Sequence, residues 1–297
     1  YRTVLRGKQA LIVLDNAKDT AQVKDLIPSE PTAVLITSRN RIKVSGIKEI
    51  DLEALELDKA VQLLRNEAGE DRLSEDEAKD IAGLCHCLPL ALRAAGAFLG
   101  EHPLWTVEDY TKALRDESQR LEKLDCEDHS VQAVLRLSVE QLFTDDGGLG
   151  VRWLGLTIFP GDFDPNAAHA MWRGASLEED RGHIEALWRR RLVIIDKETG
   201  RIRLHDLLRD VGRFVLAEQV ASGKLDEEFE YNARKAHAQH YRMVLAHADE
   251  LYLQGNEAIL EGLALFDLER NNIEYGQTWA ATNWEHDEEA AEECNKY

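Results

Sequence analysis

The stretch Q-A-L-I-V-L-D-N at residues 9–16 is a short apolar run that ends in Asp15-Asn16. A second run, A-V-L-I-T at residues 33–37, is followed by Ser38-Arg39. Short runs of aliphatic and β-branched residues between polar residues are typical of strands that are buried on both faces of a parallel sheet. The two runs therefore predict part of an α/β sheet at the start of the chain.

The segment between the two runs predicts a short crossover helix over residues 20–27, because prolines follow it at once. A third short strand is expected at residues 50–52. Three strands make a poor free-standing sheet, so the pattern favours further strands upstream. The chain also begins with Tyr1 and lacks a signal-peptide pattern, which indicates a fragment or a processed product.

Composition indicates a soluble, acidic protein of two or three domains. The chain has 297 residues, of which 44% are apolar, and its formal net charge is −20. Such a charge disfavours binding of nucleic acid or an anionic membrane by the whole surface. The net charge is −9 over residues 1–147, +1 over residues 148–224 and −12 over residues 225–297, which supports boundaries near 147 and 224.

The four cysteines, Cys85, Cys87, Cys126 and Cys294, show neither a disulfide framework nor zinc-site spacing. Free thiols favour a reducing compartment, so we expect a cytoplasmic protein. An apolar run of 18 residues is absent, so no membrane span is expected.

After residue 55 the apolar pattern becomes helical. The sequence S-E-D-E at residues 74–77 is a capping box, and Pro89 suits the first position of a helix. Residues 56–146 therefore predict a helical bundle. Within residues 147–223, helices are followed by short strands at 192–196 and 201–204 and then by another helix, which is a winged-helix arrangement.

The last block, residues 224–297, predicts a helical tail. A long helix is expected over residues 227–254, followed by helices at 257–266 and 268–282. Helix pairs of this length fit the start of a helical repeat array, although no 34-residue repeat is visible. The predicted fold class is thus α/β plus mostly α, with the α/β part at residues 1–55.

Several residues stand where a nucleotide site would need them, and each also has a structural interpretation. Asp15 ends a strand, where a carboxylate can bind magnesium, and Arg39 ends the next, where a guanidinium can contact a phosphate. Pro89 and its neighbour Leu90 open a helix with an apolar edge that suits a purine. His205 and Asp206 lie at another helix start, where the imidazole can donate to an anion or simply cap the helix.

The order of these motifs resembles the NB-ARC domain, the regulatory ATPase module of STAND-class proteins. With h for a hydrophobic residue, the motifs are hhhhD, hhTSR, L-P-L-A-L, F-P-G-D-F and L-H-D. The resemblance covers about residues 1–222. It is closest to the bacterial type, which passes into tetratricopeptide repeats. Residues 266–280 resemble that passage.

The resemblance implies an ADP/ATP-dependent signalling switch with a slow ATPase in the intact protein. Asp15 would hold Mg, and Asn16 follows it in the second catalytic position. Arg39 would read the γ-phosphate, and Pro89 with Leu90 would pack on the adenine. His205 would contact the β-phosphate of ADP, with Asp206 shaping that turn. A protein partner would bind the helical tail.

Departures from the family pattern weaken parts of this expectation. The family often has a second acid where Asn16 stands and a glycine where Cys87 stands. The phosphate loop G-x-x-x-x-G-K-[ST] does not occur in the sequence. Its backbone donors and lysine supply most phosphate contacts, so we expect this chain alone to bind ADP weakly or not at all.

Two other functions stay open. The arginines at 189–191, 201 and 203 form a basic cluster, which in a DNA-binding winged helix would contact phosphates. Asn16 and Cys87 also suit a scaffold whose nucleotide machinery has degenerated. His237, His240 and His247 could form a metal-binding face, but solvated or partner-facing histidines are favoured.

Overall fold

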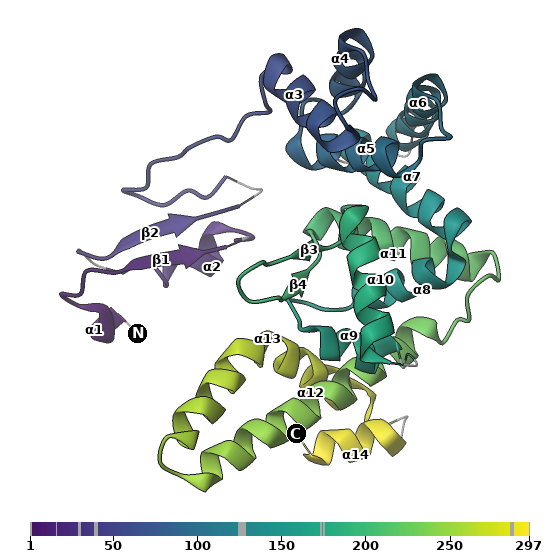
Figure 1. Ribbon diagram of the computed structural model, residues 1–297. Coiled ribbons are helices and arrows are strands. Elements are labelled where there is room, and N and C mark those ends of the chain that lie inside the picture. The colour runs from purple at the N-terminus through teal and green to yellow at the C-terminus, as the bar shows by residue number, and fades with distance from the viewer. Residues whose placement is uncertain are drawn as a thin grey trace. The chain divides into compact units, whose positions relative to one another are not determined.

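A computed structural model gives the fold (Figure 1) and describes residues 2–15, 17–28, 31–38, 41–123, 129–172, 174, 176–285 and 288–296. The chain divides into two compact units, Tyr1–Glu53 and Ala54–Tyr297, which are treated one at a time. Helices dominate the second unit, and the first contains a small parallel sheet.

The first unit contains the predicted parallel strand pair. Its elements are α1 (Arg2–Leu5), β1 (Leu11–Leu14), α2 (Thr20–Lys24) and β2 (Ala33–Ile36). Leu11 pairs with Ala33 and Leu14 with Ile36, so β1 and β2 run parallel as the sequence predicts. The third strand predicted at residues 50–52 is wrong, because this segment is irregular. Strand propensity without a neighbouring strand does not form a ladder.

The prediction that both faces of the sheet are buried is also wrong for the described residues. Val23 of α2 packs on one face beside Leu14 and Ile36. The side chains that point to the other face remain exposed, Leu11 at 63% and Leu35 at 51%. Alternate residues of a strand point to opposite faces, so one covering helix buries only every second side chain.

The predicted helical bundle forms the first part of the second unit. Its helices are α3 (Leu57–Ala68), α4 (Glu75–Leu84), α5 (Pro89–Glu101), α6 (Val107–Lys123) and α7 (His129–Asp145). The capping box is present: the Ser74 hydroxyl accepts from the backbone of Glu77, whose carboxylate accepts from the backbone of Ser74. Gly96 lets α5 cross α3 closely, because a Cβ there would lie 2.9 Å from the Leu64 carbonyl.

The next block has the element order that the sequence predicts. Its elements are α8 (Gly147–Leu156), α9 (Pro165–Trp172), α10 (Leu177–Arg189), β3 (Ile194–Ile195), β4 (Ile202–Arg203) and α11 (Asp206–Ala221). β3 and β4 pair antiparallel, and Phe163 forms an isolated bridge with Ile202. The F-P-G-D-F segment is thus attached to the hairpin. The winged-helix assignment itself stays a prediction.

The tail consists of α12 (Phe229–Gln254), α13 (Ala258–Asn283) and α14 (Glu288–Lys296). The two helices predicted at 257–266 and 268–282 are one continuous helix, because residue 267 does not interrupt the apolar face. α12 and α13 lie side by side as a long hairpin (Figure 1). Tyr241 and Ile273 belong to the same hydrophobic core as the preceding blocks, so the tail begins as part of that core.

Candidate functional site

The carboxyl ends of β1 and β2 bring an acid and a hydroxyl together. Asp15 follows β1, and its Oδ1 accepts a hydrogen bond from the Thr37 hydroxyl just after β2. The Thr37 amide donates to the Leu14 carbonyl at 2.9 Å, and the Ala17 amide donates to the Thr37 carbonyl at 2.8 Å. Sequence reasoning used this second motif only for Arg39 and missed Thr37. The signal that could have indicated this role was the pair of hydroxyl residues, Thr37 and Ser38, directly after an apolar strand.

These groups suit a magnesium ion. A carboxylate and a hydroxyl are hard oxygen donors of the kind that Mg²⁺ prefers, usually with several retained waters. Asp15 is exposed and so accessible to an ion and its waters. Among the described residues no group of three or more histidine, cysteine or acidic side chains is arranged to hold a metal. Asn16 and Arg39 lie outside the described residues.

The turn before Pro89 has an unusual backbone. The Cys87 amide donates to the Ala82 carbonyl and the His86 amide to the Gly83 carbonyl, the two bonds of a Schellman motif that ends α4. His86 and Cys87 both have left-handed φ values, 47° and 53°. Glycine usually fills such positions because it has no Cβ. A glycine at the position of Cys87 would therefore suit this backbone better than a residue with a Cβ.

The turn delivers Pro89 to the surface. Pro89 stands in the first turn of α5 after the N-cap Leu88, as the sequence predicts. Pro89 is exposed, while Leu88 and Leu90 are half-buried and pack against the core. The Cys87 carbonyl accepts from the Leu55 amide at 3.0 Å, which fixes the turn to the segment before α3. The result is an exposed proline flanked by two half-buried leucines at the start of a helix.

His205 is the N-cap of α11. Its Nδ1 accepts a hydrogen bond from the Leu207 amide at 3.3 Å. In the neutral imidazole the proton then lies on Nε2, which is a donor. His205 is exposed, and the neighbouring Asp206 accepts from Arg209 at 2.7 Å. The simple capping role is therefore present, at the positive end of a helix.

The predicted site residues are thus divided between the units. Asp15 lies in the first unit, where it contacts Thr37. Pro89, Leu90, His205 and Asp206 lie in the second unit.

Internal acids neutralise much of the basic cluster. Arg190 lies 3.6 Å from Asp145, and Arg191 pairs with Glu67 of α3. Arg201 pairs with Glu269 of α13. These contacts reduce the positive charge that would otherwise be presented to a DNA backbone.

The preference for a solvated or partner-facing histidine is wrong for His237. This residue is only 1% exposed and packs against the rings of Phe159, Tyr241 and Tyr275. Burial lowers the pKa of His237 to about 3, so the ring is neutral at pH 7. His247, in contrast, has a 62% exposed side chain. The helical period placed these residues one or two turns apart but did not show which face meets the core.

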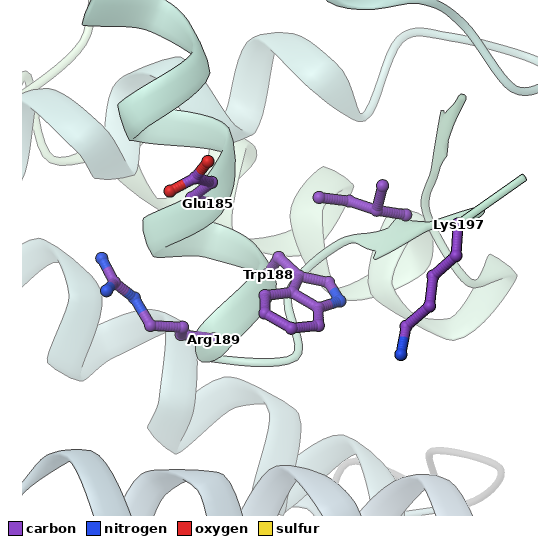
Figure 2. A pocket seen from close by; sticks show the side chains of 5 residues that line it. Glu185, Trp188, Arg189 and Lys197 are labelled. Carbon is purple, nitrogen blue, oxygen red and sulfur yellow. The ribbon is translucent and has the colours of Figure 1, made fainter. Parts of the chain in front are cut away.

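The hairpin block contains a pocket of about 310 Å³, which is seen from close by in Figure 2. Glu185, Trp188 and Arg189 of α10 line it together with Ile195 and Lys197 from the hairpin. The residues predicted to contact nucleotide are not among these lining residues. The pocket therefore does not support the nucleotide site.

The chain resembles known regulatory proteins over much of its length. It is 35% identical over 213 residues to the regulatory protein AfsR of Streptomyces coelicolor, a match that covers 70% of this chain and 21% of that protein. The AfsR of Streptomyces griseus is 36% identical, with 70% and 22% covered. The disease resistance protein RUN1 of Vitis rotundifolia is 25% identical over 232 residues, with 73% and 16% covered.

The chain thus spans about a fifth of the length of the regulatory proteins that it matches. No family model matches it. Together with the order of the motifs, the similarities support an NB-ARC-like region in this chain. No helix within the described ranges is both long enough and apolar enough to span a bilayer.

Proposed function

We propose that this chain is part of a regulatory signalling switch controlled by adenine nucleotide. The observation that carries the proposal is the placement of the motif residues: Asp15 at the carboxyl end of a parallel strand, Pro89 at an exposed helix start and His205 as an exposed N-cap. The similarity to regulatory and disease resistance proteins agrees with such a role.

In the proposed closed state, bound ADP holds the winged-helix block closed. Asp15 holds Mg, and Arg39 reads the γ-phosphate once ATP replaces ADP. Pro89 and Leu90 contact the adenine. His205 donates from Nε2 to the β-phosphate, and Asp206 holds the turn through Arg209.

Differential binding supplies the energy for the switch. Moving a two-state protein from 1:99 to 99:1 takes about 5.5 kcal/mol of differential affinity. Charge-assisted hydrogen bonds contribute roughly 1.5–3 kcal/mol each, so two or three bonds made only in the closed state suffice. The His205 contact is one of them. Exchange of ADP for ATP removes it and frees the block for oligomerisation or effector output.

Tight binding of the nucleotide requires a phosphate loop, and the motif of that loop does not occur in the sequence of 297 residues. We therefore propose that this chain alone binds ADP far more weakly than micromolar, and that the full gene product supplies the loop. Isothermal titration of the chain with ADP tests this statement, and a micromolar dissociation constant would contradict it. With Asn16 after Asp15, ATP turnover by the full gene product is expected to be slow.

His205 permits a sharper test, because its capping and nucleotide roles can be separated. Asparagine is a good N-cap but lacks the imidazole donor, whereas alanine lacks both. In the full gene product, His205→Ala and His205→Asn should each weaken ADP binding by about 10- to 100-fold, the equivalent of one charge-assisted hydrogen bond. Only His205→Ala should lower thermal stability. If His205→Asn keeps the ADP affinity of the wild type, His205 does not contact the nucleotide.

A protein partner on the helical tail is also part of the proposal. Its support is the apolar surface around the α12–α13 turn, where Leu253 is 75% exposed and Leu260 is 70% exposed. DNA binding by the hairpin block is less well supported, because Arg190, Arg191 and Arg201 already face acids. A gel shift at rising salt distinguishes the two: salt-sensitive retardation of DNA by this chain would favour the DNA-binding alternative.

A further inference from the structure

A buried ionic cluster joins the tail to the hairpin block. The side chains of Arg201 and Glu269 are 9% and 6% exposed. Arg201, directly before β4, donates to both carboxylate oxygens of Glu269 on α13, at 2.5 and 3.0 Å. It also donates to the carbonyl of Asp162 at 3.0 Å and to its Oδ1 at 3.1 Å. One guanidinium thus holds a helix, a strand and a turn.

The tail contributes a second bond to the same turn. Asn272, one helical turn after Glu269, donates to the Asp162 carbonyl at 2.8 Å and to the Glu269 carboxylate at 3.2 Å. Asn272 is 2% exposed. Residues three apart on a helix share a face, so α13 presents both side chains to the turn together.

From this turn the network reaches His205. Arg209 of α11 donates to the Gly161 carbonyl at 3.4 Å and to Asp206 at 2.7 Å. Arg201 directly precedes β4, the strand that leads into α11, and lies only four residues before His205. Residues 161–162 are therefore bonded to both sides of the His205 turn. One side is the strand before His205, and the other is the first helical turn after it.

The cluster is sensitive to the loss of any member. Burial disfavours the charge of Arg201, but hydrogen bonds to Glu269 and Asp162 outweigh this effect and raise its pKa, so the guanidinium stays charged. A buried charge that loses one partner is strongly destabilised, because water cannot replace the lost contact. The attachment of α13 therefore contributes directly to holding the turn.

We propose that Glu269 and Asn272 are positioning residues for the His205 turn, through which the docking of α13 controls the geometry of the nucleotide contact. The inference rests on the proposed function for its nucleotide part, but the mechanical link is independent of it. Displacement of α13 by a partner on the tail would release Arg201 and loosen the turn. Through this link, a change in the docking of the tail would alter the geometry of the proposed nucleotide site.

Hydrogen exchange of the full gene product, followed by mass spectrometry, tests the link. The amides of Leu208 and Arg209 bond to the His205 carbonyl at 2.9 and 3.2 Å and report on the turn. Glu269→Gln should speed their exchange at least tenfold, while exchange in α5 stays unchanged. Glu274→Gln is the matched control, because Glu274 lies on the same helix but forms an exposed pair with Arg270, and it should change nothing at residues 205–209.

Asn272→Ala is a milder variant in case Glu269→Gln prevents folding, and it should move the same amides in the same direction. Unchanged exchange at residues 205–209 in the variants that fold, or equal acceleration in α5, would overturn the link. Addition of ADP forms a separate arm. If ADP fails to slow exchange at residues 205–209 in the wild type, the nucleotide proposal fails while the link stands.

Discussion

The turn that delivers Pro89 allows one prediction to be worked through. His86 occupies the left-handed position of the Schellman motif, with φ of 47°, and its side chain is exposed. We compare His86→Gly with His86→Ala. Both variants remove the imidazole and whatever it contacts, so their difference isolates the backbone preference at this position.

The expected difference follows from two opposing terms. A left-handed conformation costs an L-residue roughly 1–2 kcal/mol, and glycine does not bear this cost. Glycine in turn loses more freedom on folding, by about 0.4–1 kcal/mol relative to alanine. The free energy of unfolding of His86→Gly should therefore exceed that of His86→Ala by about 1 kcal/mol. For a domain of 150–250 residues this corresponds to about 2–4 °C in Tm.

Urea denaturation followed by circular dichroism measures the difference, with differential scanning calorimetry as a check. The m-value should be equal in the two variants, because the surface exposed on unfolding is the same. Equal stability of the two variants, or greater stability of His86→Ala, would show that residue 86 is not left-handed in solution.

Three further predictions concern the core. The lowered pKa of His237 means that the folded state resists protonation of this ring, so its contribution to the free energy of unfolding is fully present above about pH 6.5. As the pH drops below 6.5 toward 3, the free energy of unfolding falls by about 1.4 kcal/mol per pH unit. Urea denaturation between pH 7 and 5 should show this fall, and His237→Phe should reduce it. Arg136, 2% exposed, pairs with the buried Glu117 at 2.7 Å, so Arg136→Met should cost about 3–5 kcal/mol in the same assay. Gly96→Ala would place a Cβ 2.9 Å from the Leu64 carbonyl, and calorimetry should show a loss of about 1–3 kcal/mol.

Much of the secondary structure could be predicted because its signals are local. The capping box at Ser74, the helix start at Pro89 and the parallel strand pair all appear where residue order indicates them. Caps, prolines and apolar runs act within a few residues, so the sequence contains them completely. The strand at 50–52 failed because a strand needs a partner, and a partner is not a local property.

The candidate site was predicted residue by residue but not in its contacts. Asp15 and His205 were named from motif order, and helix capping was one of the two roles open to His205. Thr37 as the partner of Asp15 was found only in the tertiary structure. The role of residue 87 changed most. The sequence showed only that Cys87 stands where the resembled domain has a glycine, and its φ of 53° adds a backbone reason for a glycine there.

The sequence by itself determined the order of elements, the uneven charge and the motif series that resembles an NB-ARC region. Only the tertiary structure decided which charges are used inside the molecule. Arg201 belongs to an apparent surface cluster in the sequence, yet it is buried against Glu269, which lies 68 residues away. His237 lies on the same helix as the exposed His247, yet it lies in the core. Burial depends on which distant segment covers a side chain, and local residue order does not specify that segment.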